Sequence, residues 1–120
     1  SRGHFFGAAA EAMRRILVDA ARARRTQRRG GGHPPRELLE GDAVELPIGD
    51  DLLDLHDALE RLAHTDRDAA EVVKWRVFGG MTVEEAAAVL NSSPRTVKRN
   101  WAWARAWLAR ELRHVGRDIG

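Results

Sequence analysis

The sequence predicts an all-α protein: a four-helix helix-turn-helix domain preceded by a flexible linker and one long amphipathic helix. Apolar residues recur at helical spacing in successive segments, no segment alternates as a strand would, and a glycine- and proline-rich stretch isolates the first segment. With 120 residues, 43% of them hydrophobic, the chain can fill a modest helical core. We expect an N-terminal helical part (1–29), a linker (30–50) and the helix-turn-helix domain (51–120).

The N-terminal part predicts a helix from about residue 5 to residue 24. Its apolar residues recur three and four positions apart. They are Phe6, Ala9, Met13, Ile16, Leu17 and Ala20. Because such a stripe needs a cover, we expect it to pack on the second domain, on another copy of the chain or inside a larger domain.

The next segment predicts a linker. Three glycines (30–32) and two prolines (34 and 35) follow a run of arginines and break both helix and strand. The arginines are equally compatible with binding phosphates, with binding an acidic protein surface and with a solvated tail that binds nothing. Residues 36–50 show no sustained period, so we expect a tethered connector there.

Two helices are expected before the helix-turn-helix. The first runs from about Asp51 to Ala63 on a leucine stripe, with acids at its start that suit the helix dipole. The second follows a capped start at 65–68 and continues to about Phe78. Two glycines at 79–80 end it, since glycine takes the left-handed cap without steric cost.

The helix-turn-helix is the feature around which the chain is organised. Thr82 and Glu85 form the pattern of a capping box that starts a short helix. Asn91 suits a left-handed turn, and Ser93 with Pro94 suits the start of a second, longer helix. Two helices joined by so tight a turn form the motif that places a recognition helix in the DNA major groove.

The periodicity of the second helix separates its packing face from its reading face. Successive residues of a helix are rotated by about 100°, which places apolar residues in one stripe and basic and small residues on the opposite face. No acidic residue lies between positions 96 and 110. The core stripe is Val97, Trp101, Ala104, Leu108 and Val115, with Leu112 at its edge. The predicted DNA-binding residues are Ser93, Arg95, Thr96, Lys98, Arg99, Asn100 and Arg105.

The tryptophans are expected to serve packing rather than base stacking. Trp101 lies on the core stripe, and we expect Trp75 to pack under it. We expect Trp103 and Trp107, four positions apart, to widen the same core.

Charge is strongly segregated along the chain. Residues 1–32 carry 8 basic and 2 acidic side chains, residues 33–92 carry 5 and 14, and residues 93–120 carry 7 and 2. Two cationic ends therefore flank an acidic middle, as expected if the ends face a polyanion.

Several function classes find no support. There is no cysteine, no histidine pair at metal-ligand spacing, no phosphate-binding glycine loop after a strand and no nucleophile elbow. We therefore expect neither an enzyme nor a metal or cofactor site. No apolar run is long enough to span a membrane, and we expect a cytoplasmic protein.

Four ordered segments resemble the promoter-binding C-terminal domain of bacterial extracytoplasmic-function (ECF) sigma factors. These segments are 57–62, 70–76, 78–87 and 93–99, and residues 12–19 are similar to the last helix of that family's N-terminal domain. The resemblance implies promoter DNA and RNA polymerase core, through its β flap, as partners, and it allows an anti-sigma protein that covers both surfaces. We also expect phosphate or polymerase contacts for arginines of the first helix and of the basic segment that follows it. These are Arg14, Arg15, Arg22, Arg24 and Arg25.

The earlier helices of the family's N-terminal domain are absent from the sequence, so we expect the chain alone to bind promoter DNA poorly. Two alternatives stay open. One is a response-regulator-type activator with a similar DNA-binding unit, and the other is a protein-interaction module that does not bind DNA. The promoter sequence, the inducing signal and the oligomeric state do not follow from the sequence.

Overall fold

The computed structural model describes residues 2–27 and 47–119, and all regular elements in this part of the chain are helical, which confirms the all-α prediction. The elements are α1 (Arg2–Gln27), α2 (Gly49–Thr65), α3 (Arg67–Val73), η1 (Lys74–Phe78), α4 (Val83–Leu90) and α5 (Pro94–Ile119). Most of the predicted linker lies outside the described residues, and α2 begins within its last residues. The division into three parts stays a prediction.

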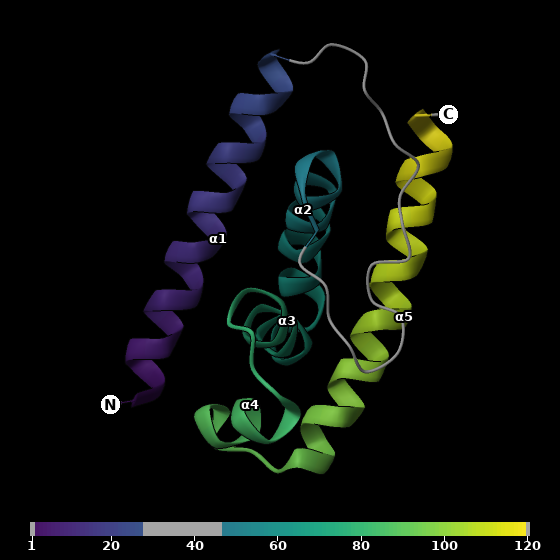
Figure 1. Cartoon of the computed structure of the whole chain (residues 1–120). Coiled ribbons are helices and arrows are strands. Elements are labelled where there is room, and N and C mark those ends of the chain that lie inside the picture. Colours follow the sequence, from purple (N-terminus) through teal and green to yellow (C-terminus); the bar gives the residue numbers. More distant parts are fainter. Residues whose placement is uncertain (1, 28–46, 120) are drawn as a thin grey trace.

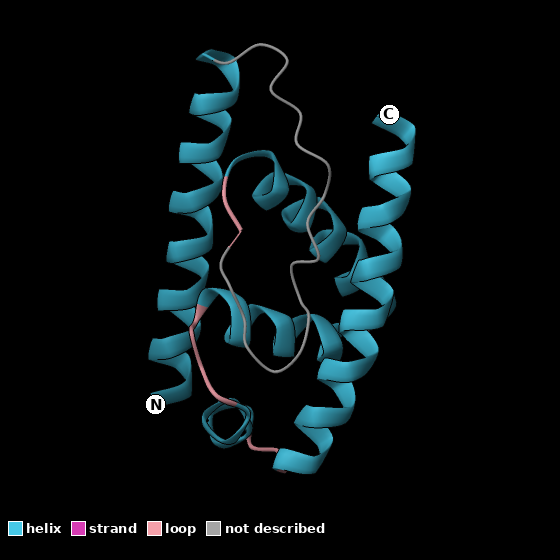
Figure 2. Ribbon diagram, turned by 45° about the vertical axis from the view of Figure 1, so that its right-hand side comes forward, coloured by secondary structure: helices cyan, strands magenta, loops and turns pink. Residues whose placement is uncertain are grey.

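The two long helices enclose the short ones. In Figure 1, α1 and α5 stand on opposite sides of α2 and α3, while α4 lies at one end and leads into the start of α5. Figure 2 shows α4 end-on at the same end of the molecule, which leaves the first turns of α5 at the periphery. The start of the predicted recognition helix is therefore open to a large partner.

The core forms where α2, α3 and α5 meet. The leucine stripe of α2 is buried as predicted, through Leu52, Leu55, Leu59 and Leu62. It packs with valines of α3 and with Val97 and Leu108 of α5. Burying a leucine or valine side chain stabilises the fold by roughly 1.5–3 kcal/mol, so this shared core holds α5 in a fixed rotation about its axis.

Side-chain caps set the helix ends of the helix-turn-helix as predicted. Thr82 Oγ1 accepts from the Glu85 N–H at 3.1 Å, and Glu85 Oε1 accepts from the Thr82 N–H at 2.9 Å. Hydrogen bonds that the Glu85 carboxyl accepts from the backbone N–H and from the side chain of Thr82 lower the pKa of that carboxyl. Asn91 ends α4 in the left-handed conformation with φ 55°, and Ser93 Oγ accepts from the Thr96 N–H at 3.1 Å.

The end of the third helix differs in detail from the prediction. The last turn is π-helical, because the Gly79 N–H donates to the Lys74 carbonyl at 3.1 Å. The left-handed residue is Gly80, with φ 64°, whereas Gly79 has φ −86°. Gly79 is needed for another reason: a Cβ there would lie 2.5 Å from the Trp75 carbonyl oxygen.

The predicted packing face of α1 is wrong for most of its residues, although the partly buried Leu17 of the predicted stripe does pack against the core. The buried residues are Ala10, Val18 and Ala21, whereas Ile16 of the predicted stripe is 63% exposed. A Cβ on Gly7 would come within 3.3 Å of the Trp75 ring, so α1 approaches the other helices through small side chains. Four larger apolar residues of α1 point away from the other helices. They are Phe5, Phe6, Met13 and Ile16.

A polar contact completes the docking of α1. Arg14 is only 12% exposed in its side chain, and its Nη2 donates to Glu60 Oε1 of α2 at 2.7 Å. Its Nε donates to His56 Nδ1 at 3.1 Å, and its guanidinium lies 5.9 Å from the Phe78 ring centroid. One arginine of α1 thus joins two other helical elements.

Candidate nucleic-acid interface

The outer face of α5 carries the side chains that sequence analysis assigned to DNA. Arg95, Lys98 and Arg99 are exposed on its first turns, and the small Ala102 and Ala106 are exposed beyond them. The core stripe is buried on the opposite side, so the predicted rotation of this helix is confirmed up to Leu112. The side chain of Val115 lies outside the described residues.

The other predicted residues occupy the margins of this face. Thr96 and Asn100 are half-buried, and Ser93 Oγ donates to Thr96 Oγ1 at 2.9 Å in addition to capping the helix. Arg105 is half-buried and turns towards Trp101, with its guanidinium carbon 5.9 Å from that ring. Arg105 therefore lies to one side of the most exposed cations.

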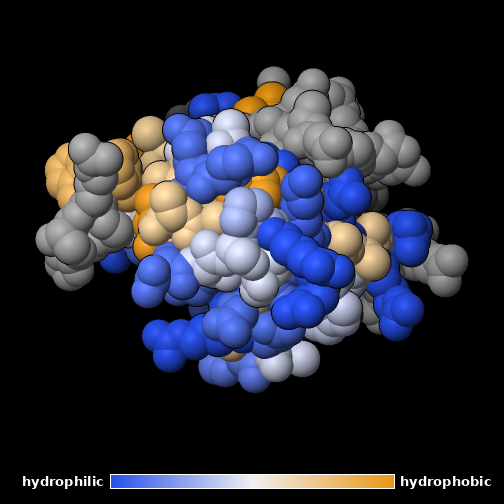
Figure 3. Space-filling model, turned by 90° about the horizontal axis from the view of Figure 1, so that it is seen from below, coloured by the Kyte–Doolittle hydropathy of each residue, from blue (hydrophilic) through white to orange (hydrophobic). Residues whose placement is uncertain are grey.

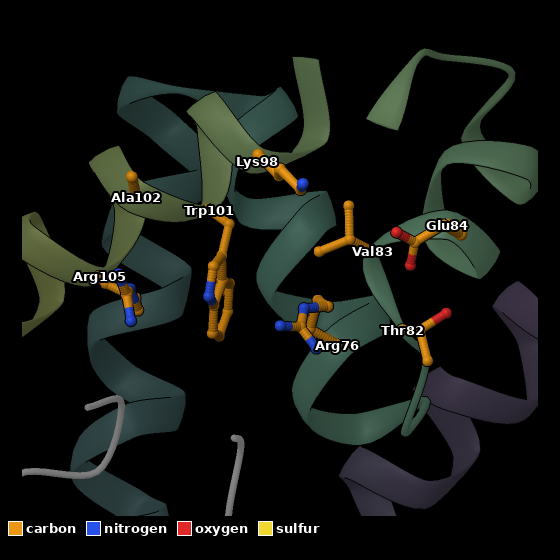
Figure 4. Close-up of a pocket in the computed structure, with 8 residues that line it drawn as sticks. All are labelled: Arg76, Thr82, Val83, Glu84, Lys98, Trp101, Ala102 and Arg105. Carbon is orange, nitrogen blue, oxygen red and sulfur yellow. The ribbon is translucent and has the colours of Figure 1, made fainter. Parts of the chain in front are cut away.

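Arg105 lines an open pocket of about 590 Å³ between α5, the start of α4 and η1. Figure 4 shows Trp101 between Arg105 and Arg76, with Lys98 near the indole and the first residues of α4 on the side of Arg76. The lining residues are Arg76, Thr82, Val83, Glu84, Lys98, Trp101, Ala102 and Arg105. Three cations and one acid thus border the pocket, beside the N-terminus of α4.

The pocket arginines are held by their surroundings. The Arg76 guanidinium carbon lies 4.7 Å from the Trp101 ring centroid, and Arg76 Nη1 donates to the Met81 carbonyl at 3.2 Å. Trp101 is 3% exposed and forms the floor between the two guanidinium groups. Cations stacked on an aromatic ring keep their charge and lose little rotational freedom when they bind an anion.

The surface around these groups is polar. Figure 3 looks onto the end of the molecule that holds α4 and the start of α5, and hydrophilic colours cover most of it, while apolar colours gather on the side of α1. A cationic helix face, a cationic pocket and a helix N-terminus on one side of the molecule suit a polyanion.

The arginines of α1 have different surroundings. Arg14 is largely enclosed by its contacts with α2, and Arg25 Nε lies 3.5 Å from Asp50 Oδ1. Arg15, Arg22 and Arg24 are exposed. Arg15, Arg22 and Arg24 can therefore contact an external partner without disrupting the contacts of Arg14 or Arg25 with α2.

Two residues of this region were missed or misplaced by the sequence analysis. Arg76 was not assigned to the interface, because only the fold brings the end of the third helix next to α5. Trp103 was expected in the core and is 44% exposed, which corrects that prediction. Its position one turn after Arg99 was a usable signal. Trp107 is half-buried against the core, as expected.

Two further features are absent from residues 2–27 and 47–119. No group of three or more His, Asp or Glu side chains there could hold a metal ion. None of the helices in the same part of the chain is long and apolar enough to cross a membrane.

A family model described as "ECF sigma factor" matches residues 1–114. The chain belongs to the ECF sigma factor family. Comparisons with curated proteins and with solved structures gave no match. The family consists of transcription regulators, not enzymes, and its partners are RNA polymerase and promoter DNA.

Proposed function

We propose that the chain directs RNA polymerase to promoters and that α5 reads the upstream promoter element from the major groove. The observation that carries this proposal is the face formed by Arg95, Lys98 and Arg99. These cations are exposed on the first turns of a helix whose opposite side is locked in the core. In helix-turn-helix docking, this part of the recognition helix contacts base edges.

Helix geometry limits which arginines reach bases. Arg95 and Arg99 are about 6 Å apart along the axis, which is well within a groove about 12 Å wide. Arg110 lies about 22 Å beyond Arg95 on the same scale. Only the first two can then pair with base edges, while later arginines meet phosphate or the polymerase flap.

The pocket between α4 and α5 supplies a second kind of contact. Arg76, Lys98 and Arg105 border it together with the first residues of α4, and the three cations outweigh the one acid, Glu84, so the pocket favours a phosphate. We assign to it a DNA phosphate next to the groove that α5 occupies. Phosphate contacts fix orientation without reading sequence.

The polymerase is the second partner of the proposal. The exposed Arg15, Arg22 and Arg24 of α1 suit an acidic protein surface or phosphate, and the far end of α5 suits the β flap. An anti-sigma protein that covers both surfaces would block both contacts. Family membership favours this function over a response-regulator-type activator.

A salt titration tests the DNA part of the proposal against a module that binds only protein. The chain is titrated with a labelled duplex at several salt concentrations. We expect affinity to fall steeply with salt, and Lys98→Ala to reduce the slope of log K against log[salt] by about one unit. Arg67, exposed at the start of α3 and outside the pocket, supplies the control Arg67→Ala, which should keep the slope. No duplex binding at low salt, either by the chain alone or by its complex with core polymerase, would leave only the protein module.

A further inference from the structure

Trp103 has no role in the proposed function so far. From Gly49 to Arg113, it is the only large apolar side chain that is exposed to solvent. The other tryptophans in that range are buried or half-buried. A single exposed apolar residue is common on protein surfaces, so its surroundings decide whether it has a ligand.

The side chains around Trp103 are either positively charged or small. Arg99 lies one turn before Trp103, and Ala106 and Arg110 follow on the same side of α5, all of them exposed or small. Between positions 96 and 110 the helix carries no acid. The next acid, Glu111, accepts from Arg61 of α2 at 3.1 Å and so faces the protein. An occupant of this face therefore meets positive charge and one aromatic ring.

The side of α5 that carries Trp103 is continuous with the face that carries Arg95 and Arg99. Trp103 follows Arg99 by about 6 Å along the helix axis and Arg95 by about 12 Å. That distance is about the width of the major groove. If Arg95 and Arg99 reach base edges, the ring of Trp103 arrives at the wall of the groove, where sugars and phosphates lie.

We propose that Trp103 is a DNA-contacting residue that packs its indole against the sugar-phosphate backbone at the wall of the major groove. The ring offers apolar area for deoxyribose, and its Nε1–H is a donor for a phosphate oxygen. The exposed Ala102 and Ala106 leave room for the backbone to approach. This inference rests on the proposed function and adds a positioning contact to it, since a backbone contact sets the depth and register of α5 without reading sequence.

An uncharged contact has a distinctive signature. It releases no counterion, so its loss should weaken all sequences alike and leave the salt slope unchanged. This separates Trp103 from a base-reading arginine, whose loss changes sequence preference, and from a phosphate-binding cation, whose loss lowers the slope.

The test uses the whole chain and a set of upstream-element duplexes, each with one changed base pair, at two salt concentrations. We expect Trp103→Ala to bind every duplex roughly tenfold more weakly with the parent salt slope, and Trp103→Phe to retain most of the affinity. Ile16→Ala, an exposed apolar residue on the outer side of α1, is the matched control and should bind like the parent. Acrylamide quenching of the parent's tryptophan fluorescence should decrease when duplex is added.

Three results would overturn the proposal. If Trp103→Ala binds duplexes as tightly as the parent, the ring contacts a protein partner and not DNA. If affinity is lost for only some duplexes, Trp103 contacts bases. Quenching that duplex leaves unchanged would show that DNA does not cover the ring. If the parent binds no duplex either alone or in complex with core polymerase, the proposed function fails as well, whereas normal parent binding with an unaffected Trp103→Ala overturns this inference alone.

Discussion

His56 joins α2 to α1 through a single ring nitrogen. Because Arg14 Nε donates to His56 Nδ1, that nitrogen has to be unprotonated in the docked state. Burial and the nearby Arg14 guanidinium lower the pKa of His56 from its ordinary 6.5, while Glu60 and Asp57 act in the opposite direction. The folded chain therefore binds this proton less readily than the unfolded chain.

The sign of the pH effect follows from that difference. His56 contributes its full stability above the unfolded pKa of 6.5, and the contribution is lost as the pH falls below it towards the lower folded value. We expect the melting temperature to fall between about pH 7.5 and about pH 5.5, and to fall less for His56→Asn. His64→Asn, at an exposed position of the same helix, should behave like the parent. Equal slopes for His56→Asn and the parent would remove His56 as the cause.

Single residues also show where sequence reasoning reaches its limit. Arg95 and Arg99 could be placed on the outer face because a helix repeats about every 3.6 residues and its apolar stripe identifies the inside. Arg76 could not be placed in the pocket, since its neighbour Trp101 is distant in sequence and only packing brings them within 4.7 Å. Arg14 was expected to meet an external partner, and nothing in its local sequence indicates Glu60 as a contact.

At the scale of elements, the turn before α4 depends on two glycines with different tasks. A Cβ at position 79 would lie 2.5 Å from a backbone oxygen, which a side-chain movement cannot relieve. A Cβ at position 80 meets nothing within 4 Å, and only the left-handed φ of Gly80 matters there. Asparagine tolerates that conformation better than other side chains do.

The same substitution at both positions therefore separates the two tasks. We expect Gly79→Asn to reduce the free energy of unfolding by more than about 1 kcal/mol, and Gly80→Asn to reduce it by less than about 1 kcal/mol. Urea denaturation of both variants measures the difference. Equal losses would mean that Gly79 is not packed against the Trp75 carbonyl.

Helix positions were largely predictable, but the packing face of α1 was not. Capping residues such as Thr82, Asn91 and Ser93 carry their own signal, because each satisfies a backbone group at a helix end. The packing face of α1 was predicted from the apolar residues that recur at helical spacing. That prediction failed because it favours the largest apolar residues. The docked face is built instead from Gly7, Ala10, Val18 and Ala21, and the missing side chain at Gly7 lets α1 approach the Trp75 ring of η1 closely.

At the scale of the whole molecule, α1 docks on α2 and η1. The glycines and prolines of the linker gave no indication of this contact. Arg14 and its neighbour Arg15 offer a matched pair, since the first is enclosed against α2 and the second is exposed. We expect Arg14→Ala to destabilise the chain by about 1–2 kcal/mol, a value reduced by the exposure of Glu60, and Arg15→Ala to have little effect. Thermal melts of both variants provide the measurement, and similar melting temperatures would show that Arg14 does not hold α1.

Docked α1 and the helix α5 lie on opposite sides of the molecule, with α2 and α3 between them (Figure 1). The DNA-facing end can therefore engage a duplex while α1 stays in place. This arrangement fits a chain whose two cationic ends serve separate contacts and whose acidic middle forms the shared support.

The central claim is that the first turns of α5 read promoter sequence, and one binding measurement tests it most directly. Arg95→Ala, Arg99→Ala and the exposed Arg113→Ala are compared on upstream-element duplexes with single changed base pairs, at two salt concentrations. A guanine-paired arginine contributes about 1–3 kcal/mol of discrimination. We therefore expect the first two variants to lose the preference among duplexes, and Arg113→Ala to keep it. Equal losses on every duplex for Arg95→Ala and Arg99→Ala would contradict the claim and leave both residues as phosphate anchors.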